Sequence, residues 1–582
     1  MLEELLLQVN KPARYIGEEW NVSRKRFEPA AIKFALSFPD LYEVGMSNLG
    51  IRIIYGVLNS QPDIVCERVF SVNEDLEDKL RQEERSIFSL ESKKPLKDFD
   101  LVGFSLGSEL GFTNVLRILD LGNIPLKGAE RDKSNPLVIA GGACSMNPEP
   151  MHEFVDCFMI GEVEESILEF IAVYREYMDK FRSGVMSKEE LLIRLAQVEG
   201  VYCPSLYEVR YGEDGRAKEF KPRFPGLPAE IKKRFVRNLD QSYFPVDWLV
   251  PYIQVVHDRV PIEVMRGCPN RCRFCQARSQ YAPLRFRSHK QIVDLAQCAY
   301  KFTGYEELSL IGLSVSDYPD IDKVLEDLNK LFQGKGISLS LPSIKAKAEV
   351  GNLSSIIARV KKTGLTFAPE AGSERLRNML AKDFNEQGFF QALEEAYRSG
   401  YQHVKLYFMI GLPGEEASDL DAIIDFSVRV SELSRKVVGR PAQVNISINT
   451  LIPKPHTAFQ WCGMDPQDSM KNKQDYLRSK TRNKRLKLSF HNRGMSFLEG
   501  VLSRGDRRLS QVILSAFKNG ARFDAWGDRF SIDKWMDAFR ESQVDPESYL
   551  KGKQPDGVLP WDFIDVGIDK ESLRQEYNKI LQ

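Results

Sequence analysis

The chain has 582 residues, of which 43% are hydrophobic and 28% are charged, and its formal net charge is −1. This length exceeds what one hydrophobic core supports, so we expect two to four domains. A net charge so close to zero excludes a global field that would attract nucleic acid or membranes. No apolar run is long enough to cross a bilayer, and the first twenty residues do not resemble a signal peptide. Outside one short cluster the nine cysteines are scattered, so we expect a cytoplasmic protein with reduced thiols.

The first 185 residues alternate between apolar strand patterns and helical patterns. We expect strands at residues 31–38, 63–70, 99–106, 136–142 and 156–161, and helices at 49–58, 113–121 and 164–177. This alternation predicts a doubly wound parallel sheet, a Rossmann-like domain over residues 1–185. Ligands of such sheets bind beyond the carboxyl ends of the strands. Those ends carry Asp40, Gly45, Ser105, Glu109, Gly141, Gly142, Gly161 and Glu162.

Residues 186–250 form a connector with a stiff proline-rich stretch at 222–228. The β/α alternation resumes in residues 251–465. Strands are expected before Cys268 and at residues 307–313, 337–341, 365–370, 403–410 and 443–449. Helices are expected at 291–302, 321–332, 353–361, 389–398 and 419–434, which makes six β/α units.

Three cysteines on one short loop dominate this second domain. Cys268, Cys272 and Cys275 are spaced C-x-x-x-C-x-x-C, and thiolates are strong ligands for iron. A zinc site would need a second pair of Cys or His at a matching distance, and a disulfide is disfavoured in a reducing compartment. We therefore predict an iron–sulfur cluster with these three cysteines as metal ligands. Because a fourth cysteine is missing, one iron stays open for chemistry.

With Phe274 before the last cysteine, the loop resembles that of radical S-adenosylmethionine (SAM) enzymes. The resemblance implies a [4Fe-4S] cluster whose open iron binds the amino and carboxylate groups of SAM. Reductive cleavage of SAM then yields a 5′-deoxyadenosyl radical, with the electron coming from a flavodoxin- or ferredoxin-type donor. It also implies a partial (β/α)6 barrel of TIM type, with chemistry at the carboxyl ends of its strands.

The resemblance further implies cofactor contacts at these strand ends. Ser314, Ser316 and the following Asp317 lie where many members have a Gly-Gly-Glu run that contacts the amino group of the methionine part of SAM. Glu370 ends the fourth strand, where members often contact the ribose, although it could instead cap the next helix. The expected cofactor-binding residues are thus Phe274, Ser314, Ser316, Glu370, Arg375 and Lys405.

Arg375 and Lys405, like Glu370, allow a second interpretation. Arg375 could bind the cofactor carboxylate as a fork, or be a helix-surface arginine. Lys405 lies inside a strand, where its charge is costly unless it faces the barrel mouth. His456, in the segment expected to close the barrel, is either near the active-site mouth or a hydrogen-bonded structural histidine.

The N-terminal domain resembles the cobalamin-binding-like domain that precedes the radical domain in one large subgroup of the family. Some members of that fold carry Asp-x-His-x-x-Gly, whose His ligates cobalt. The matching run here is Asp40 to Gly45 with Tyr42 in place of His, and a neutral Tyr is a poor metal ligand. Cobalamin therefore stays open as a third cofactor. With it, methylation of an unactivated carbon is the leading reaction; without it, hydrogen abstraction followed by rearrangement or oxidation is left open.

Residues 466–582 are expected to be mostly helical. Eight Lys and Arg residues between 471 and 487 form either a solvated helix face or an RNA-facing patch. An RNA- or ribosome-associated modifying or binding protein is thus an alternative function, and an iron–sulfur sensor is a third. A full methylthiotransferase is disfavoured because the N-terminal domain has no second cysteine triplet. Taken together, the motifs resemble an uncharacterised bacterial family of radical SAM proteins with an N-terminal cobalamin-type domain.

The ligand assignment gives a direct prediction. Cys272→Ala should lose the cluster because it removes one of three thiolate ligands, whereas Cys298→Ala should keep it. Iron content and the visible absorbance of anaerobically reconstituted protein measure this. Equal iron loss in both variants would contradict the assignment.

Overall fold

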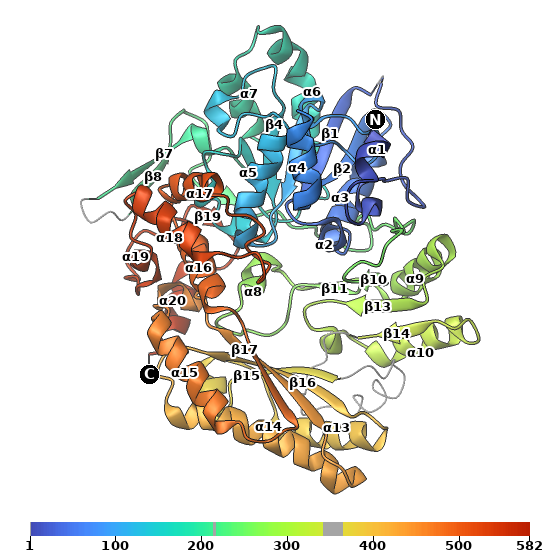
Figure 1. Cartoon of the computed structure of the whole chain (residues 1–582), viewed down its shortest axis with the longest axis vertical. Helices are drawn as coiled ribbons and strands as arrows, with labels where there is room; N and C mark the ends of the chain where they lie inside the picture. The colour runs from blue at the N-terminus through green and yellow to red at the C-terminus, as the bar shows by residue number, and fades with distance from the viewer. Residues whose placement is uncertain (1, 29, 213–216, 342–364, 582) are drawn as a thin grey trace.

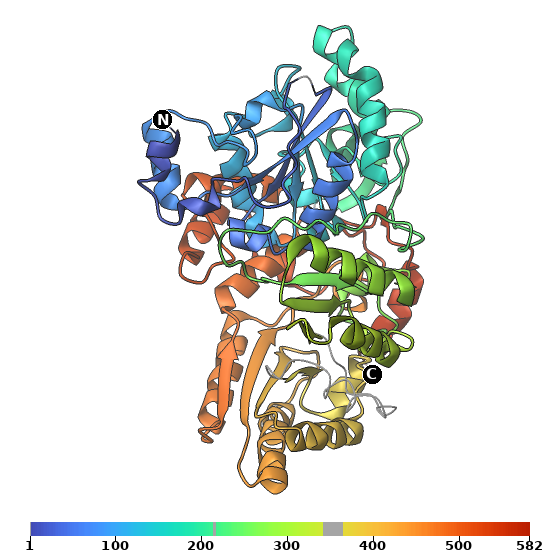
Figure 2. The same ribbon diagram turned by 90° about the vertical axis from the view of Figure 1, so that its right-hand side faces the viewer.

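The computed structural model describes residues 2–28, 30–212, 217–341 and 365–581. An N-terminal α/β domain lies at one end of the molecule and a partial barrel at the other, with the C-terminal helices between them (Figures 1 and 2). The predicted α/β fold class is confirmed. Within the described residues, every helix is too short or too polar to span a bilayer.

The N-terminal domain is built on a six-stranded sheet in the order β2-β1-β3-β4-β5-β6. Five strands run parallel and the short β6 is antiparallel to β5. The strands are β1 (Ile32–Phe38), β2 (Ile64–Phe70), β3 (Leu101–Ser105), β4 (Leu137–Gly141), β5 (Cys157–Met159) and β6 (Val201–Tyr202). Its main helices are α3 (Leu49–Asn59), α5 (Phe112–Leu121), α6 (Ser166–Ser183) and α7 (Lys188–Leu195). The predicted doubly wound sheet is therefore confirmed, strand by strand.

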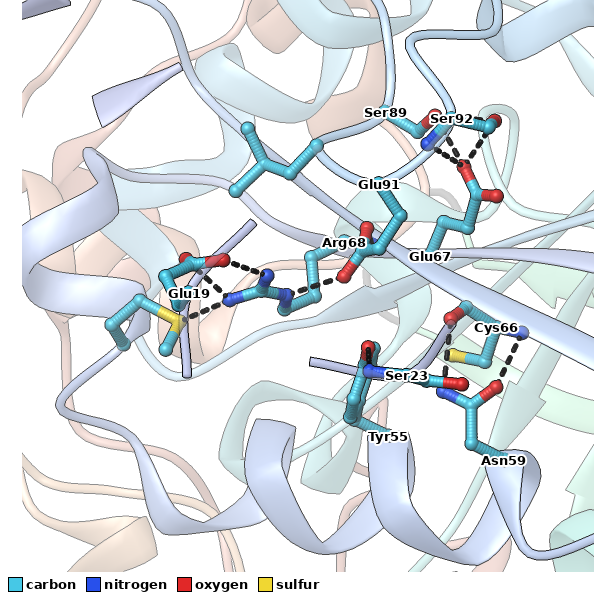
Figure 3. Close-up of polar contacts among 12 residues, drawn as sticks. Glu19, Ser23, Tyr55, Asn59, Cys66, Glu67, Arg68, Ser89, Glu91 and Ser92 are labelled. Carbon is cyan, nitrogen blue, oxygen red and sulfur yellow. Dashed lines mark hydrogen bonds and ion pairs between the residues drawn. The ribbon is translucent and has the colours of Figure 1, made fainter. Parts of the chain in front are cut away.

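An ion cluster lies inside this domain (Figure 3). Arg68, on β2, is fully buried and donates to Glu19 at 2.7 and 2.9 Å and to Glu91 at 2.7 Å. Tyr42 is 2% exposed and donates its hydroxyl to Glu19 at 2.8 Å. Through Glu19, the Tyr42 hydroxyl is therefore part of the buried hydrogen-bond network around Arg68 of β2. This structural role accounts for the tyrosine at position 42.

The barrel strands form two parallel sheets in chain order. The first contains β10 (Val260–Glu263), β13 (Glu307–Ile311) and β14 (Ser338–Ser340); the second contains β15 (Leu365–Glu370), β16 (His403–Ile410), β17 (Gln443–Thr450) and β18 (Leu486–Phe490). The covering helices are α9 (His289–Thr303), α10 (Ile321–Phe332), α13 (Glu386–Arg398), α14 (Ala417–Val438) and α15 (Gln467–Lys480). All six expected strands are present, and the helix expected at 353–361 lies outside the described residues.

β18 corrects the interpretation of the basic run as one helix. The helix α15 ends at Lys480, and Lys487 lies on β18, which pairs in parallel with β17. On α15, Lys471, Lys473 and Arg478 form ion pairs with Asp475 or Glu415. These pairs are typical of a solvated helix face, and an RNA-facing patch stays a prediction.

The C-terminal helices pack against the N-terminal domain. Buried side chains of α16 (Arg493–Arg504), α17 (Leu509–Lys518) and α18 (Ile532–Glu541) belong to the same hydrophobic core as the N-terminal sheet. Strand β19 (Ile564–Asp565) pairs with β9 (Ile231–Lys232) of the connector, and α20 (Lys570–Asn578) follows it. A hairpin of β7 (Tyr207–Tyr211) and β8 (Ala217–Pro222) also lies in the connector. The two ends of the chain therefore fold around one core.

The buried cluster predicts a pH-dependent stability. Burial alone raises the pKa of Glu19, but the charge and hydrogen bonds of Arg68 outweigh it and lower the pKa to about 2. Because the folded pKa lies below the unfolded value, the stabilisation is complete above about pH 4.5 and is lost as the pH falls towards 2. Glu19→Ala should cost about 3–5 kcal/mol of unfolding free energy at neutral pH. It should also reduce the loss of stability between about pH 4.5 and pH 2.

The exposed Glu28, paired with Lys33, provides the control. Glu28→Ala should cost under about 1 kcal/mol because surface pairs contribute little. Urea unfolding followed by circular dichroism between pH 2 and 7 measures both variants. A Glu19→Ala stability indistinguishable from that of Glu28→Ala would contradict the assigned role.

Candidate active site

The cysteine loop starts at a backbone position that only glycine accommodates. Strand β11 (Met265–Arg266) pairs in antiparallel fashion with β12 (Arg285–Phe286) on the far side of the loop. Between β11 and Cys268, Gly267 has a φ of +88°, and a Cβ there would lie 2.8 Å from the Cα of Leu284. A side chain at this point would push the two sides of the loop apart. The glycine therefore lets the three cysteines project from a closed loop base.

The thiols lie in a half-buried setting near a carboxylate. All three cysteines are partly exposed, and Asn270 Nδ2 lies 3.4 Å from Cys268 Sγ. Burial raises the pKa of the Cys275 thiol, and the nearby Cys268 and Glu370 raise it further. Within the described residues, no three His, Cys, Asp or Glu side chains lie close enough together to hold one metal ion. A [4Fe-4S] cluster makes no such demand, because each cysteine binds a different iron.

The loop is anchored to the barrel and to the end of the chain. The backbone N–H of Arg273 donates to Leu380 O at 3.0 Å, and its guanidinium donates to Met379 O at 2.6 Å, at the end of α12 (Glu374–Met379). Phe274 packs half-buried in a hydrophobic cluster on the barrel. From α8 (Gln276–Gln280), Arg278 makes two hydrogen bonds of 2.7 and 2.9 Å with Glu576 of α20. These contacts hold the cysteines at the carboxyl ends of the strands.

The structure brings the Ser314 region to the cysteines. The hydroxyl of Ser314 donates to Asp317 at 2.6 Å, and Asn270 donates to the same carboxylate oxygen at 3.0 Å. Ser316 lies in the same short turn, Val315–Asp317. A polar chain thus runs from the end of β13 to Cys268. Asn270 had no role in the sequence analysis, although it lies within the cysteine motif.

Glu370 also lies at this end of the barrel. It is the last residue of β15, with a φ of +70°, and it forms an ion pair of 3.2 Å with Lys382. A left-handed φ is strained for a side chain of this size, and such strain often occurs at functional positions. Arg273 of the cysteine loop donates to Met379 O and Leu380 O, shortly after Glu370 in the chain, so Glu370 ends β15 on the side of the barrel where this loop is anchored.

Arg375 and Lys405 lie in other surroundings. The guanidinium of Arg375 binds Asp419 and donates to Gly414 O at 2.9 Å, and its side chain is 54% exposed. Lys405 is the third residue of β16, and the carboxyl end at Ile410 lies five residues further on, about 16 Å away. His456 is buried and donates from Nε2 to Met146 O at 3.0 Å. Burial lowers its pKa to about 4, so it is neutral at pH 7, as for a structural histidine.

A cavity of about 600 Å³ joins the N-terminal sheet to the base of the cysteine loop. Of the strand-end residues singled out from the sequence, five line it: Ser105, Gly141, Gly142, Gly161 and Glu162. Met265, Arg266 and Gly267 form the barrel side. Asp40 accepts instead from Trp526 Nε1 at 2.9 Å, and Glu109 binds Lys454 at 2.9 Å. Gly45 and Tyr42 are also absent from the lining.

Glu162 joins the two domains at this cavity. Its carboxylate accepts from the guanidinium of Arg285 at 2.8 Å, lies 2.9 Å from that of Arg266, and accepts from Val236 N at 2.7 Å. Burial alone raises its pKa, but the two arginines outweigh it and lower the pKa. Because Arg266 and Arg285 lie on β11 and β12, Glu162 holds the base of the cysteine loop. The sequence places Glu162 at a strand end, but nothing in it indicates these long-range partners.

Comparisons with known proteins agree with this architecture. Residues 50–204 match the family model for radical SAM proteins, N-terminal, and residues 262–427 match that of the radical SAM superfamily. The chain belongs to the radical SAM superfamily.

Three relatives illustrate the range of this similarity. An uncharacterised protein of Methanocaldococcus jannaschii is 28% identical over 511 residues, covering 88% of this chain and 97% of that protein. The radical SAM methyltransferase TsrM of Kitasatospora setae is 14% identical, with a TM-score of 0.43 over 72% of this chain and 73% of that one. The cobalamin-dependent SAM radical enzyme OxsB is 14% identical, with a TM-score of 0.45 over 94% and 83%.

The Glu162 contacts predict a role in holding the cluster loop. Glu162→Gln removes the charge that faces Arg266 and Arg285, so the loop base should loosen and iron should leave several-fold faster. Iron release to a chelator from anaerobically reconstituted protein measures this. Glu165→Gln is the control, because that side chain is 57% exposed and 3.7 Å from Arg234. Equal release rates for the two variants would rule the role out.

Proposed function

We propose that this radical SAM enzyme holds cobalamin in the cavity between its two domains and transfers a methyl group to an unactivated carbon. The observation that carries the proposal is the cavity itself. It connects the carboxyl ends of the N-terminal strands with Met265, Arg266 and Gly267 at the start of the cysteine loop. A cofactor placed there would lie between the N-terminal sheet and the cluster.

The lining suits a large cofactor with a flat, mostly apolar face. Glycines 107, 141, 142 and 161 line the cavity at or just beyond the strand ends, and Gly103 lines it from within β3. At Gly107 a Cβ would meet no heavy atom within 4 Å, so this position opens onto free space. Asn48, Ser105 and Gln280 add polar groups for hydrogen bonds.

The same lining contains no His or Cys. Its carboxylates are engaged by arginines, since Glu162, Glu164 and Glu263 all pair with Arg266. Cobalamin would therefore be held by packing and hydrogen bonds, without a cobalt ligand from the protein. The internal position of Tyr42 supports the same conclusion.

Each residue around the cluster would have a distinct role. Cys268, Cys272 and Cys275 would bind three irons, and the cluster, when bound, supplies the electron that cleaves SAM. Asp317 would accept from the amino group of SAM, with Ser314 and Asn270 fixing its orientation. Glu370 would accept from the ribose hydroxyls, and Phe274 would exclude water from the loop. An external one-electron donor of the flavodoxin or ferredoxin type would supply the cluster.

The direct test is anaerobic purification and reconstitution with iron, sulfide and hydroxocobalamin. Absorbance measures the retained cobalamin, and mass spectrometry measures 5′-deoxyadenosine after addition of SAM and dithionite. Retention together with cleavage supports the proposal. Cleavage without retention would refute the cobalamin assignment and leave the cavity as a substrate or partner site. Absence of cleavage would refute the radical reaction.

A cavity-filling variant sharpens this test. Gly107→Phe should reduce cobalamin retention at least about tenfold, because the ring would occupy the open space at the strand ends, while the iron content stays normal. Gly527→Phe is the matched control, since a Cβ at Gly527 also meets nothing within 4 Å and this residue does not line the cavity. Equal cobalamin retention in the two variants would place the cofactor elsewhere.

A further inference from the structure

The second barrel sheet has two faces of opposite character. Val404, Leu406 and Phe408 of β16 are buried in one core with side chains of α13 and α14. Because side chains alternate along a strand, Lys405 and Tyr407 point to the opposite, inner face. On β17 the same alternation turns Asn445 and Ser447 inward. Barrel interiors are normally filled by packed branched side chains, so a polar inner face is unusual.

One row across this face is exposed on all four strands. Thr366 on β15 is in register with Lys405 on β16, Lys405 with Asn445 on β17, and Asn445 with Lys487 on β18. All four side chains are exposed. In the next row, Ser447 faces Ser489. The row therefore offers two ammonium groups, an amide and hydroxyls to whatever lies inside the barrel.

The charge of this row is not balanced within the described part of the chain. Neither Lys405 nor Lys487 makes an ion pair there, and the ammonium of Lys405 lies 4.6 Å from the ring centroid of Tyr407. Lys473 on the outer helix α15, in contrast, contacts the carboxylates of Glu415 and Asp465 at 2.7 Å. The two inner lysines are two strands apart, about 10 Å between backbones, so their long side chains can converge on one anion.

We propose that the row Thr366–Lys405–Asn445–Lys487 binds an anionic group of the substrate, a phosphate or a carboxylate. This inference rests on the proposed function, because it assumes that the barrel interior is the substrate site. It names the substrate class: a small molecule whose anionic group lies deep in the barrel and whose reacting carbon lies towards the cysteines. Ammonium groups and amide or hydroxyl donors are the usual partners of such groups.

The carboxylate of SAM does not fit this row. In the proposed arrangement it lies at the open iron, beside the carboxyl ends of the strands. Lys405 is five residues before the end of β16, about 16 Å from that position. A lysine side chain cannot span this distance, so the proposed anion belongs to a second molecule.

The test uses reconstituted protein with SAM bound and measures the binding of pyrophosphate and of citrate by calorimetry at low and high salt. Wild-type protein should bind at least one of them, more weakly at high salt. Lys405→Gln and Lys487→Gln should each weaken this binding about tenfold. Lys436→Gln, on the exposed outer helix α14, changes the charge equally and should have no effect. A preference for pyrophosphate identifies a phosphate group, and a preference for citrate a carboxylate.

Three results would overturn the inference: no binding of either anion, an equal loss in Lys436→Gln, or binding of a single-stranded RNA in place of the small anions. The formation of 5′-deoxyadenosine by the same wild-type preparation separates this failure from that of the proposed function. If SAM is cleaved but no anion binds, only the substrate class is wrong. If SAM is not cleaved, the proposed function fails independently of anion binding.

Discussion

The ion cluster around Glu162 is the interaction on which the relation of the two domains depends. The carboxylate of Glu162, shortly after β5, accepts from Arg285 and forms an ion pair with Arg266, so it contacts both strands that frame the cysteine loop. Breaking a buried ion pair leaves an uncompensated charge in a low-dielectric setting, which is costly. This contact thus fixes how the two domains are oriented to each other, and both Glu162 and Arg266 line the cavity between them. The position of the cysteines relative to the N-terminal sheet is a consequence of electrostatics as much as of packing.

Local patterns were enough to predict most of the fold. Apolar runs such as residues 31–38 and 403–410 are strands within a residue or two, because burial on a sheet demands β-branched and aromatic side chains. Strand β18 was missed because Lys487 and Ser489 alternate with apolar residues inside a basic run. In this run the many charged residues hide the alternation of apolar and polar residues that would indicate a strand. The strand forms because β17 offers an open edge, which is tertiary information.

The site residues show the same difference between local patterns and long-range contacts. The cysteine ligands are predicted from their spacing, and Ser314 and Glu370 from the resemblance to radical SAM enzymes at strand ends; these roles stay predictions. Asn270, Arg266 and Arg278 act through residues far away in the chain. Although Asn270 lies within the cysteine motif, the sequence does not indicate any of these partners. Arg375 shows the opposite case. Its motif suggested the carboxylate of SAM as a partner, but in the structure it pairs with the carboxylate of Asp419 in the same chain. Residue type and spacing predict which chemistry is present, and only the fold determines which groups meet.

The hydrogen bonds between Arg278 and Glu576 have a consequence for how the protein is made. They join the helix that follows the third cysteine to the last helix of the chain. During synthesis, Glu576 emerges some three hundred residues after the cysteines, so the nascent loop lacks this support. The loop can therefore reach its final geometry only after α20 has been synthesised. α20 is thus a support of the cysteine loop that is added late in synthesis, although it lies beside one of the first elements of the barrel to be made.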